Sequence, residues 1–439
     1  MGKVEELKKK IDRKELKIGI IGLGYVGLPL AVEFAKAGFD TVGIDIDPKK
    51  VYTINRGESY IPDVPSDEVK QLVEMQKLKA TQDYSEIEAI DAIFVCVPTP
   101  LSKTKDPDMR FVIQAVKSIK DRLREGHIIS LESTTYPGTT EEIVQPILEE
   151  SGLKAGKDFY LAFSPERIDP GNKKFTVKNT PKVVGGVNPD STEIVAYLYS
   201  QIINEVVKVS SPKAAEMTKL LENTFRSVNI ALVNEFAIMC DILGIDVWEV
   251  IDAASTKPFG FMKFYPGPGI GGHCIPIDPL YLSWKLKTLN YNARFIELAS
   301  EINTNMPRYV VQKIADALNE KQKSIKGSKI LILGIAYKKD INDLRESPAI
   351  DIIRLLEEKG AYVEYNDPYV PNAMINGKMR ESANLTKELL ESFDCVVITT
   401  DHSNYDYEFI ARHAKLIVDT KNALKKVPMD IKEGKLYKL

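Results

Sequence analysis

Residues 18–27 read Ile-Gly-Ile-Ile-Gly-Leu-Gly-Tyr-Val-Gly, an apolar run that ends in a turn with three closely spaced glycines. A helical pattern follows over residues 28–37, and a second apolar run over residues 41–44 ends on the carboxylate of Asp45. Strand, glycine turn, helix, strand and acid is the order of a dinucleotide-binding βαβ unit. The sequence therefore predicts a Rossmann-like fold at this point of the chain.

The glycines of this turn have separate predicted roles. Gly22 would make the tight turn, Gly24 would let the backbone approach a pyrophosphate, and Gly27 would allow close packing of helix on strand. Tyr25 and Val26 lie within the same turn, so we expect them to contact the same cofactor.

Asp45 stands about twenty residues beyond the turn, where an acid accepts hydrogen bonds from the ribose hydroxyls of the cofactor. No arginine follows it directly to meet a 2′-phosphate, so we expect NAD rather than NADP. The simpler alternative is a carboxylate at a solvated strand end with no cofactor role.

Further apolar runs predict an α/β fold with two doubly wound Rossmann-like domains joined by a central helical region. The first domain, residues 1–205, would gain strands near residues 92–97, 127–131, 159–163 and 182–184. The central region, residues 206–320, begins with a long helix from Pro212 to about Gly244. The second domain, residues 321–439, has strand-like runs at 329–334, 361–367, 394–400 and 416–419 but no three-glycine turn.

Composition excludes several classes of protein. The 439 residues are 44% hydrophobic and 28% charged with a net charge of −3, so no basic excess points to nucleic acid. No apolar run reaches the roughly 20 residues that span a bilayer, and residues 1–17 lack the apolar core of a secretory signal. Four scattered cysteines and four dispersed histidines suggest neither a disulfide framework nor a metal site. We expect a soluble cytoplasmic protein with reduced thiols, no metal and no membrane partner.

One cysteine lies in an unusual loop. Residues 265–278 read Tyr-Pro-Gly-Pro-Gly-Ile-Gly-Gly-His-Cys-Ile-Pro-Ile-Asp, with Cys274 at the tip. The glycines permit positive φ and close approach to a ligand, and the prolines stiffen the loop. Cys96, Cys240 and Cys395 lie in apolar patterns and are expected to be small buried hydrophobes. Taken alone, a cysteine in such a loop is more often structural than reactive.

Polar segments follow three of the predicted strands of the first domain. Because ligands bind at the carboxyl edge of an open parallel sheet, we expect side chains in these segments to contact cofactor or substrate. The residues concerned are Pro98 and Thr99, Ser133 and Thr134, and Glu166 and Arg167.

Two further positions combine polar character with helical spacing. Lys219 and Asn223 lie four residues apart on the long helix, hence on one face. Periodicity alone favours a solvated stripe there, because Glu222 and Arg226 form an oppositely charged pair at the same spacing. Asp278 precedes a proline and a helical run, a pattern typical of a helix N-cap that is compatible with a catalytic role.

Several longer motifs occur in order along the chain: Gly-Leu-Gly-Tyr-Val-Gly-Leu-Pro, Val-Cys-Val-Pro-Thr-Pro, Glu-Ser-Thr-Thr-Tyr-Pro-Gly-Thr-Thr, Ser-Pro-Glu-Arg, Lys-Leu-Leu-Glu-Asn-Thr-Phe-Arg, Gly-Gly-His-Cys-Ile-Pro-Ile-Asp-Pro and Ala-Tyr-Lys-Lys-Asp. With them the sequence resembles the UDP-glucose/GDP-mannose dehydrogenase family from Gly22 to Asn422, nearly its whole length. The resemblance implies a four-electron oxidation of a UDP-sugar at C6, from primary alcohol to carboxylate, with two NAD.

The resemblance also implies a role for each catalytic residue. Cys274 would be the nucleophile, which adds to the C6 aldehyde and carries a thiohemiacetal and then a thioester. Such an adduct holds the intermediate while NADH leaves and NAD enters. Lys219 would stabilise the C6 oxyanion, and Asn223 would bind the same oxygen or the catalytic water. Asp278 would pair with Lys219 and help to activate water. Glu166 would be the general base of thioester hydrolysis, and Thr134 would hold the reacting water or the nicotinamide end.

By the same resemblance, residues 1–205 would bind NAD, residues 206–320 would mediate dimerisation and carry the catalytic loop, and residues 321–439 would bind the UDP-sugar. Tyr337 and Lys338 would reach the nucleotide, and Arg345 would cross toward the cofactor. The substrate would also contact Glu166, Arg167, Lys219, Asn223 and the backbone at Tyr265, Gly267, Gly269 and Gly271. The family further suggests a homodimer or a higher homo-oligomer.

The sequence departs from typical UDP-glucose dehydrogenases around residues 164–172, around Lys257 and at the histidine beside Cys274. These departures resemble the subgroup that acts on UDP-N-acetylhexosamines, particularly UDP-N-acetylglucosamine, in making sugars for surface polysaccharide. UDP-N-acetylmannosamine, UDP-N-acetylgalactosamine and UDP-glucose are alternatives. Two other classes are a catalytically silent nucleotide-sugar binder and a two-electron dehydrogenase of the 6-phosphogluconate type. The three classes predict two, no or one NADH per UDP-sugar.

Overall fold

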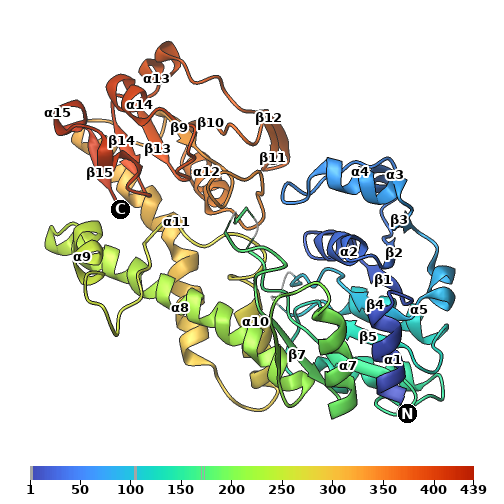
Figure 1. The fold of residues 1–439 in the computed structure, drawn as a ribbon. Coiled ribbons are helices and arrows are strands. Elements are labelled where there is room, and N and C mark those ends of the chain that lie inside the picture. Colours follow the sequence, from blue (N-terminus) through green and yellow to red (C-terminus); the bar gives the residue numbers. More distant parts are fainter. Residues whose placement is uncertain (1–2, 103–105, 170, 173) are drawn as a thin grey trace. The chain divides into compact units, whose positions relative to one another are not determined.

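The chain divides into two compact units in the computed structural model, which describes residues 3–102, 106–169, 171–172 and 174–439 (Figure 1). The first unit comprises Met1–Glu222 and Trp284–Tyr291, and the second comprises Asn223–Ser283 and Asn292–Leu439. The boundary therefore falls within the long helix α8 (Pro212–Leu243), which has the length that the sequence predicts. The division of the chain at residues 205 and 320 stays a prediction.

The first unit contains an eight-stranded sheet in the order β3-β2-β1-β4-β5-β6-β7-β8. Neighbouring strands are parallel except for β6 and β7. The first six follow the Rossmann order 3-2-1-4-5-6, so the point where the order reverses lies between β1 and β4. The strands are β1 (Lys17–Ile21), β2 (Asp40–Ile44), β3 (Leu78–Thr81), β4 (Ala92–Val95), β5 (Ile128–Leu131), β6 (Tyr160–Phe163), β7 (Lys182–Gly186) and β8 (Val206–Lys208).

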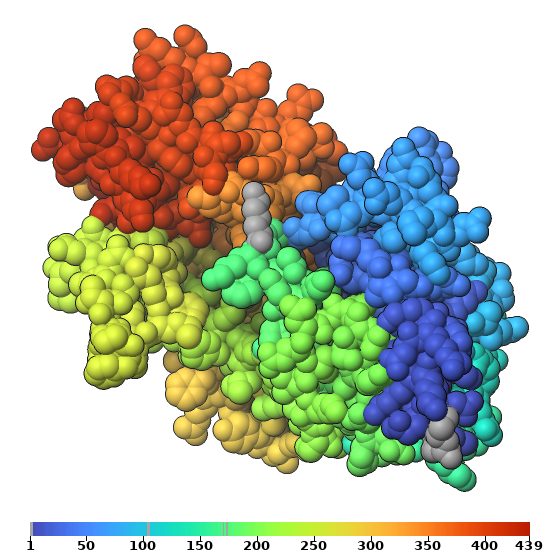
Figure 2. All heavy atoms as spheres, in the orientation of Figure 1, coloured from blue at the N-terminus to red at the C-terminus, as the bar shows by residue number. Residues whose placement is uncertain are grey.

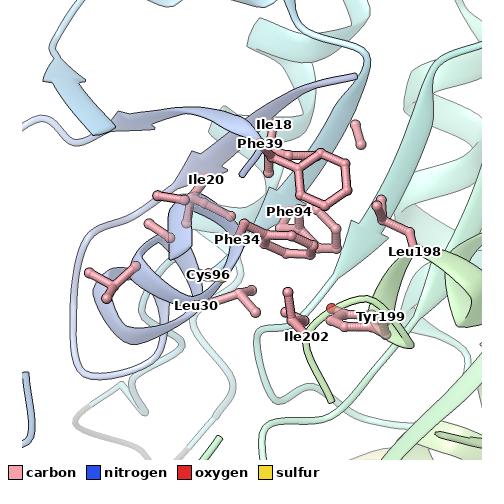
Figure 3. Packing of buried hydrophobic residues seen from close by; sticks show 14 of the residues in the cluster. Ile18, Ile20, Leu30, Phe34, Phe39, Phe94, Cys96, Leu198, Tyr199 and Ile202 are labelled. Carbon is pink, nitrogen blue, oxygen red and sulfur yellow. The ribbon is translucent and has the colours of Figure 1, made fainter. Parts of the chain in front are cut away.

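Aromatic packing holds α2 and α7 against one face of this sheet (Figure 3). The ring of Phe34 on α2 lies 4.9 Å from that of Phe94 on β4, measured between centroids, and Phe94 in turn contacts Tyr199 at the end of α7. The helices of this unit are α1 (Lys3–Asp12), α2 (Gly27–Lys36), α3 (Pro48–Asn55), α4 (Ser66–Glu74), η1 (Tyr84–Ala89), α5 (Arg110–Lys120), η2 (Thr140–Val144), α6 (Gln145–Glu149) and α7 (Pro189–Tyr199).

The second unit is built on a five-stranded parallel sheet in the order β10-β9-β13-β14-β15. This is the flavodoxin-like order 2-1-3-4-5, in which the switch point lies between the first and third strands. The strands are β9 (Lys329–Leu333), β10 (Tyr362–Asn366), β13 (Cys395–Ile398), β14 (Ile417–Asp419) and β15 (Leu436–Lys438), and a separate hairpin consists of β11 (Asn372–Ile375) and β12 (Lys378–Glu381).

Alternate residues of β9 pack into two different clusters. Ile330 and Ile332 lie with α11 and α12, whereas Leu331 and Leu333 lie with α13 and α14. Both faces of the sheet are therefore covered, as a parallel sheet requires. The helices are α9 (Val247–Ala254), α10 (Asp278–Lys287), α11 (Arg294–Glu320), α12 (Pro348–Glu358), α13 (Lys387–Ser392), α14 (Tyr407–His413), η3 (Ala423–Lys426) and α15 (Met429–Lys432).

The chain end fixes α9 within the second unit. The indole of Trp248 donates a hydrogen bond to the carbonyl oxygen of Leu439, with a nitrogen–oxygen distance of 3.1 Å. The segment after α9 lies at the surface, yellow-green in Figure 2, and exposes Phe259 and Met262. The glycine loop begins after this segment, at Tyr265.

Candidate active site

The three glycines of the first turn have different environments, which explain why a glycine occurs at each position. Gly22 has φ +94°, and a Cβ added there would lie 2.6 Å from the carbonyl oxygen of Cys96. A Cβ on Gly27 would lie 1.8 Å from the carbonyl oxygen of Gly22, so helix α2 can start only with a glycine at this position. A Cβ on Gly24 would meet no protein atom within 4 Å, which leaves open space for close approach of a ligand. These three environments agree with the predicted dinucleotide turn and fit the pyrophosphate of NAD.

Asp45 is buried directly after β2, so the strand end is not solvated as the simpler alternative assumes, while the cofactor role of Asp45 stays a prediction. One carboxylate oxygen accepts hydrogen bonds from the amide of Leu23, at 2.7 Å, and from the ammonium of Lys50, at 3.0 Å. The other oxygen accepts from the amide of Asp47 at 2.9 Å. Asp45 therefore ties the glycine turn to the end of β2. The sequence did not reveal Lys50 as its partner.

The residues predicted at the ends of β4 and β5 lie next to the switch point of the first sheet. Pro98 is exposed and Thr99 is buried, while Thr134 is partly exposed. The hydroxyl of Ser133 donates to the carbonyl oxygen of Val97 at 2.7 Å, so it joins the two strand ends to each other. In an open parallel sheet this is where the cofactor would bind.

The carboxylate of Glu166 is held from two sides. One oxygen accepts hydrogen bonds from the backbone amides of Arg167 and Ile168, at 2.6 and 2.7 Å. The other oxygen lies 3.3 Å from the ammonium of Lys182, the first residue of β7. Pro170, in the same segment, lies outside the described residues. Glu166 is therefore fixed within the first unit.

Arg167 was predicted to contact substrate, but its guanidinium already has partners in the protein. It lies 2.6 Å from a carboxylate oxygen of Glu222 on α8 and donates to the carbonyl oxygen of Pro181 at 2.6 Å. Glu222 thus pairs with Arg167, whereas the sequence suggested Arg226. The result is a link between the segment that carries Glu166 and helix α8.

A buried carboxylate on α8, Glu216, also holds this helix against the first unit. Glu216 accepts hydrogen bonds from the backbone amides of Gly138 and Thr140, at 2.5 and 2.9 Å. Lys219 lies three residues from Glu216 and three from Glu222, and both neighbours fix its position on the helix. Its side chain is only 7% exposed, which contradicts the solvated stripe that periodicity favours. Asn223, at 5% exposed, contradicts it as well.

In the second unit, Asn223 donates a hydrogen bond from its side-chain amide to a carboxylate oxygen of Asp278, over 2.5 Å. Asp278 is the first residue of α10 and is 2% exposed. Its backbone amide donates to the carbonyl oxygen of Cys274 at 2.8 Å, and Cys274 itself is exposed. Three of the predicted catalytic residues are therefore close together. The other cysteines, Cys96, Cys240 and Cys395, are buried, as predicted.

The glycine loop packs against the connection between β9 and α12. A Cβ on Gly271 would lie 2.4 Å from the Cβ of Tyr337, and the φ of Gly272 is +86°. The amide of Gly272 donates to the carbonyl oxygen of Arg345 at 2.8 Å. The amide of Gly267 donates to the side chain of Asn234 at 2.9 Å. Two amides predicted to face the sugar nucleotide are therefore bonded within the protein.

Other predicted ligand residues also support this loop. Tyr265 donates from its hydroxyl to Asp252 at 2.5 Å and stacks on Trp248, with ring centroids 5.3 Å apart. The guanidinium of Arg345 is paired with Asp343 at 2.6 Å. A Cβ on Gly269 would lie 3.1 Å from the ring of Pro348. These contacts position the loop, while their roles toward a ligand stay predictions.

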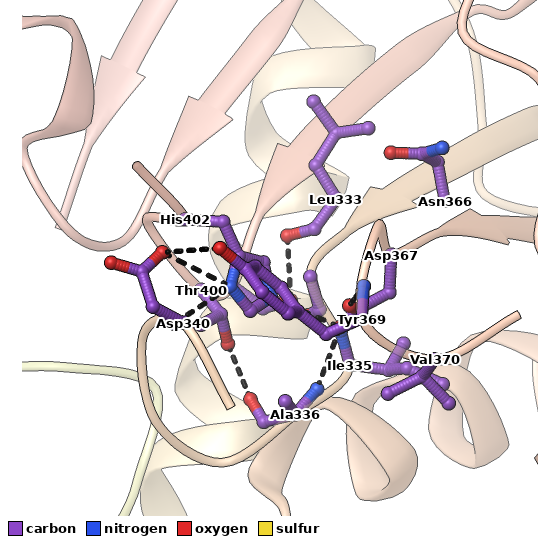
Figure 4. Close-up of polar contacts among 12 residues, drawn as sticks. Leu333, Ile335, Ala336, Asp340, Asn366, Asp367, Tyr369, Val370, Thr400 and His402 are labelled. Carbon is purple, nitrogen blue, oxygen red and sulfur yellow. Dashed lines mark hydrogen bonds and ion pairs between the residues drawn. The ribbon is translucent and has the colours of Figure 1, made fainter. Parts of the chain in front are cut away.

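A second strand–turn–acid arrangement lies at the switch point of the second sheet (Figure 4). Asp367 follows β10 as Asp45 follows β2, and one of its oxygens accepts from the amides of Ile335 and Ala336, at 2.7 and 2.9 Å. The same oxygen lies 3.1 Å from Nε2 of the buried His402. Burial alone would raise the pKa of Asp367, but hydrogen bonds from His402 and from the amide of Ala336 outweigh it and lower this pKa. Tyr337 and Lys338, directly after these amides, start the loop that supports the Cys274 segment.

The predicted catalytic residues are divided between the two units. Thr134, Glu166 and Lys219 belong to the first unit, and Asn223, Cys274 and Asp278 belong to the second. Their union in one site stays a prediction. Within the described part of the chain, no group of three or more His, Cys, Asp or Glu side chains is arranged to hold a metal ion. No described helix is long and apolar enough to span a membrane.

Three parts of the chain match the three domains of one known protein family. The sequence matches the UDP-glucose/GDP-mannose dehydrogenase family in its NAD binding domain over residues 16–203, its central domain over residues 213–305 and its UDP binding domain over residues 331–426.

Individual relatives carry three different sugar names. The chain is 40% identical over 359 residues to a UDP-N-acetyl-D-glucosamine 6-dehydrogenase of Pseudomonas aeruginosa, covering 81% of this chain and 84% of the relative. The fold matches a UDP-D-ManNAc dehydrogenase from Pyrococcus horikoshii, with TM-score 0.87, 33% identity and coverage of 96% and 99%. It also matches an NDP-N-acetyl-D-galactosaminuronic acid dehydrogenase from Methanosarcina mazei Go1, with TM-score 0.82, 32% identity and coverage of 100% and 97%.

Proposed function

Because this chain belongs to the UDP-glucose/GDP-mannose dehydrogenase family and is an NAD-dependent UDP-sugar dehydrogenase, we propose that it oxidises C6 of a UDP-N-acetylhexosamine to the carboxylate. Two successive two-electron oxidations convert the primary alcohol first to an aldehyde and then, through a thioester, to the acid. When bound in the first unit, NAD would supply the hydride acceptor for each oxidation, so one UDP-sugar would consume two NAD.

The observation that carries the proposal is the cluster of Cys274, Asp278 and Asn223. An exposed thiol at the tip of a braced loop can add to an aldehyde carbon, which gives a thiohemiacetal whose oxidation leaves a thioester. Attack of water on the thioester releases the acid and returns the thiol. Without the covalent step, an exposed thiol in this loop would have no role in the reaction.

We assign roles to the other polar groups from the resemblance to the family. Asp278, held by Asn223, helps to activate the water, and Asn223 retains amide hydrogen-bonding capacity toward an oxygen at C6. Lys219 supplies the positive charge that stabilises the oxyanion at C6. Glu166, with its carboxylate fixed by two backbone amides, acts as general base in hydrolysis of the thioester. Thr134 holds the reacting water or the nicotinamide end.

The cofactor would occupy the turn of the first sheet. Gly22, Gly24 and Gly27 would hold the pyrophosphate, with Tyr25 and Val26 in the same turn. The carboxylate of Asp45 would accept hydrogen bonds from the ribose hydroxyls. Pro98, Thr99 and Ser133 would line the nicotinamide side of the switch point. The UDP-sugar would lie at the switch point of the second sheet, against Tyr337 and Lys338. Arg345 would reach toward the cofactor.

The preferred sugar is proposed to be UDP-N-acetylglucosamine. Support comes from the 40% identity to a relative of that name, and from the departures around residues 164–172. The test is kcat/KM with UDP-N-acetylglucosamine, UDP-N-acetylmannosamine, UDP-N-acetylgalactosamine and UDP-glucose, with the acids identified by mass spectrometry. We expect the first to give the highest value. A higher value for UDP-glucose would contradict assignment to the N-acetylhexosamine subgroup, and a higher value for another hexosamine would change only the sugar.

We propose a homodimer formed through α8. This helix exposes a set of large apolar side chains whose burial in a partner would be favourable: Leu221, Phe225, Leu232, Phe236 and Ile242. Light scattering during gel filtration should give twice the 49.2 kDa mass of the chain, or a multiple of that dimer. A monomer at micromolar concentration would contradict this assignment.

A further inference from the structure

A buried lysine lies behind the proposed general base in the first unit. The ammonium of Lys182 is 2.7 Å from a carboxylate oxygen of Glu132 and 3.3 Å from one of Glu166. The exposed fractions of the three side chains are 5%, 0% and 14%. These groups therefore form a buried row of carboxylate, ammonium and carboxylate, of which Glu166 is the most exposed to solvent.

Lys182 keeps its charge in this environment. Burial opposes the ionised form, but the two carboxylates outweigh it and raise the pKa of Lys182 above the ordinary value. The ammonium also lies 5.2 Å from the ring centre of Tyr199, a distance at which a cation is attracted to the ring face. A buried charge of this kind is stable only while its partners stay in place.

The far end of the row is fixed independently of Glu166. The other oxygen of Glu132 accepts a hydrogen bond from the hydroxyl of Ser130 at 2.7 Å and another from the hydroxyl of Tyr199. Tyr199 in turn packs against Phe94 in the main core of the unit. Glu132 thus anchors Lys182 from behind, and the ammonium can move little without breaking this pair.

At the near end, Lys182 provides the side-chain contact to Glu166. The backbone amides of Arg167 and Ile168 bind one oxygen of this carboxylate, and the ammonium faces the other. Together these contacts fix the orientation of the carboxylate, and a general base must be correctly oriented to take a proton from water. Loss of the ammonium would let the carboxylate rotate.

We propose that Lys182, anchored by Glu132, is a positioning residue that holds the carboxylate of Glu166 oriented for hydrolysis of the thioester. The inference rests on the proposed function, because it takes from there the role of Glu166 as general base. It extends that function by a residue of β7 that acts only through Glu166. Formation of the thioester does not require this row, so the two stages of the reaction separate its effect from general damage to the protein.

The experiment uses the full-length enzyme with UDP-N-acetylglucosamine and NAD. The variants are Lys182→Met, Lys182→Arg, Glu166→Gln and the double variant Glu132→Gln/Lys182→Met. The double variant serves as the folding control, because it removes the ammonium without leaving Glu132 as a buried unpaired charge. Thermal unfolding shows which variants fold. Rapid mixing gives the NADH burst, and mass spectrometry of quenched enzyme gives the fraction of Cys274 held as adduct.

For Lys182→Met and the double variant we expect steady-state turnover to fall about tenfold or more, with the adduct accumulating. The rate of the NADH burst and kcat/KM for the UDP-sugar should stay within about twofold of the native enzyme, since neither depends on hydrolysis of the thioester, and KM for the UDP-sugar should fall together with kcat. Lys182→Arg should recover part of the turnover, because it restores a cation next to both carboxylates.

Failure of the inference and of the proposed function can be told apart. If Glu166→Gln accumulates adduct but the folded double variant turns over at the native rate without adduct, Lys182 has no positioning role. If Glu166→Gln also turns over at the native rate, Glu166 is not the base, and the proposed function is wrong on this point together with the inference. Equal slowing of the burst and of hydrolysis in the double variant would indicate general structural damage and would also overturn the inference.

Discussion

The side-chain amide of Asn223 on α8 donates a hydrogen bond to Asp278 on α10, with both side chains almost entirely buried. The two residues are 55 positions apart in the chain. Their contact connects the long helix to the helix that starts four residues after Cys274. The position of the Asp278 carboxylate relative to the Cys274 loop is therefore set by a buried polar contact within the second unit.

Replacing Asn223 by Ala should damage both stability and catalysis. The change leaves an oxygen of the buried Asp278 without this donor, which costs about 1–3 kcal/mol of the free energy of unfolding. Turnover should fall about a hundredfold, because Asp278 loses its orientation. Steady-state kinetics and thermal unfolding measure the two effects. Asn229→Ala is the matched control on the same helix, because the side-chain amide of Asn229 donates to the nearby backbone carbonyl of Phe225 and the residue is partly exposed. An Asn223→Ala variant as active as this control would contradict the role.

The glycines of the cofactor turn should respond differently to the same change. Gly24→Ala meets no protein atom, so the variant should fold with a normal melting temperature but bind NAD at least about tenfold more weakly. Gly27→Ala would drive a methyl group against the carbonyl oxygen of Gly22, so it should lower the melting temperature as well. Calorimetric titration with NAD and thermal melting test this pair. Native NAD affinity in Gly24→Ala would show that the pyrophosphate lies elsewhere.

Gly271→Ala should impair the reaction while leaving NAD binding intact. The new Cβ would overlap the Cβ of Tyr337 and approach the carbonyl oxygen of Glu346 to 2.9 Å, so the Cys274 loop must shift. We expect about a hundredfold loss of kcat/KM for the UDP-sugar, since a displacement near 1 Å costs that much. Gly377→Ala in the β11–β12 hairpin is the control, because its Cβ meets nothing within 4 Å and only its φ of +73° is strained. Equal activity of the two variants would contradict a loop held by Tyr337.

His127 makes stability depend on pH. Burial first, and then the charge of Arg124, lowers the pKa of this side chain from 6.5 to about 4. Between pH 6.5 and about 4, His127 is therefore protonated in the unfolded chain but neutral in the folded protein. The free energy of unfolding decreases as pH falls through this range. The loss amounts to about 3 kcal/mol over that range.

His127→Asn tests this sign, because its side-chain oxygen can replace Nδ1 as acceptor for the amide of Arg124. Melting temperatures of the native protein and the variant should be compared at pH 7 and pH 5. The native protein should lose more stability on acidification than the variant. An equal loss in both proteins would show that other groups dominate.

Local patterns predicted the fold well. The residues from Ile18 to Asp45 form one compact βαβ unit, so their spacing alone indicates strand, turn, helix and acid. The helix from Pro212 was likewise predicted with its correct length. The strands β3 and β8, the β11–β12 hairpin and β15 were missed. They are short edge elements with few apolar residues, such as Lys378–Glu381, and carry little periodic signal.

The site was less accessible from sequence, because its polar contacts arise between elements distant in the chain. Lys182 meets Glu132 and Glu166 only because β5, β6 and β7 are neighbours in the sheet. Nothing in the spacing of these residues signals that contact. The same holds for Arg167, whose pairing with Glu222 depends on where α8 packs. Helical periodicity made Lys219 and Asn223 look solvated, because it cannot show which polar stripe is covered by another element.

Cys274→Ser should reduce formation of the acid by several orders of magnitude. A serine hydroxyl adds poorly to an aldehyde, and an oxygen ester is hydrolysed more slowly than a thioester. The fold should be unaffected, since Cys274 is exposed and the change removes little packing. Assay of the uronic acid by mass spectrometry measures the loss. Near-native turnover of the folded variant would contradict covalent catalysis.

The most direct test of the account is the number of NADH formed per UDP-sugar consumed. A limiting amount of UDP-N-acetylglucosamine is converted to completion with excess NAD, and NADH is read by absorbance while the product is identified by mass. Two NADH and a C6 carboxylate are the result that a four-electron oxidation through Cys274 predicts. One NADH with a C6 aldehyde as the product, or binding of the UDP-sugar with no NADH at all, would contradict it.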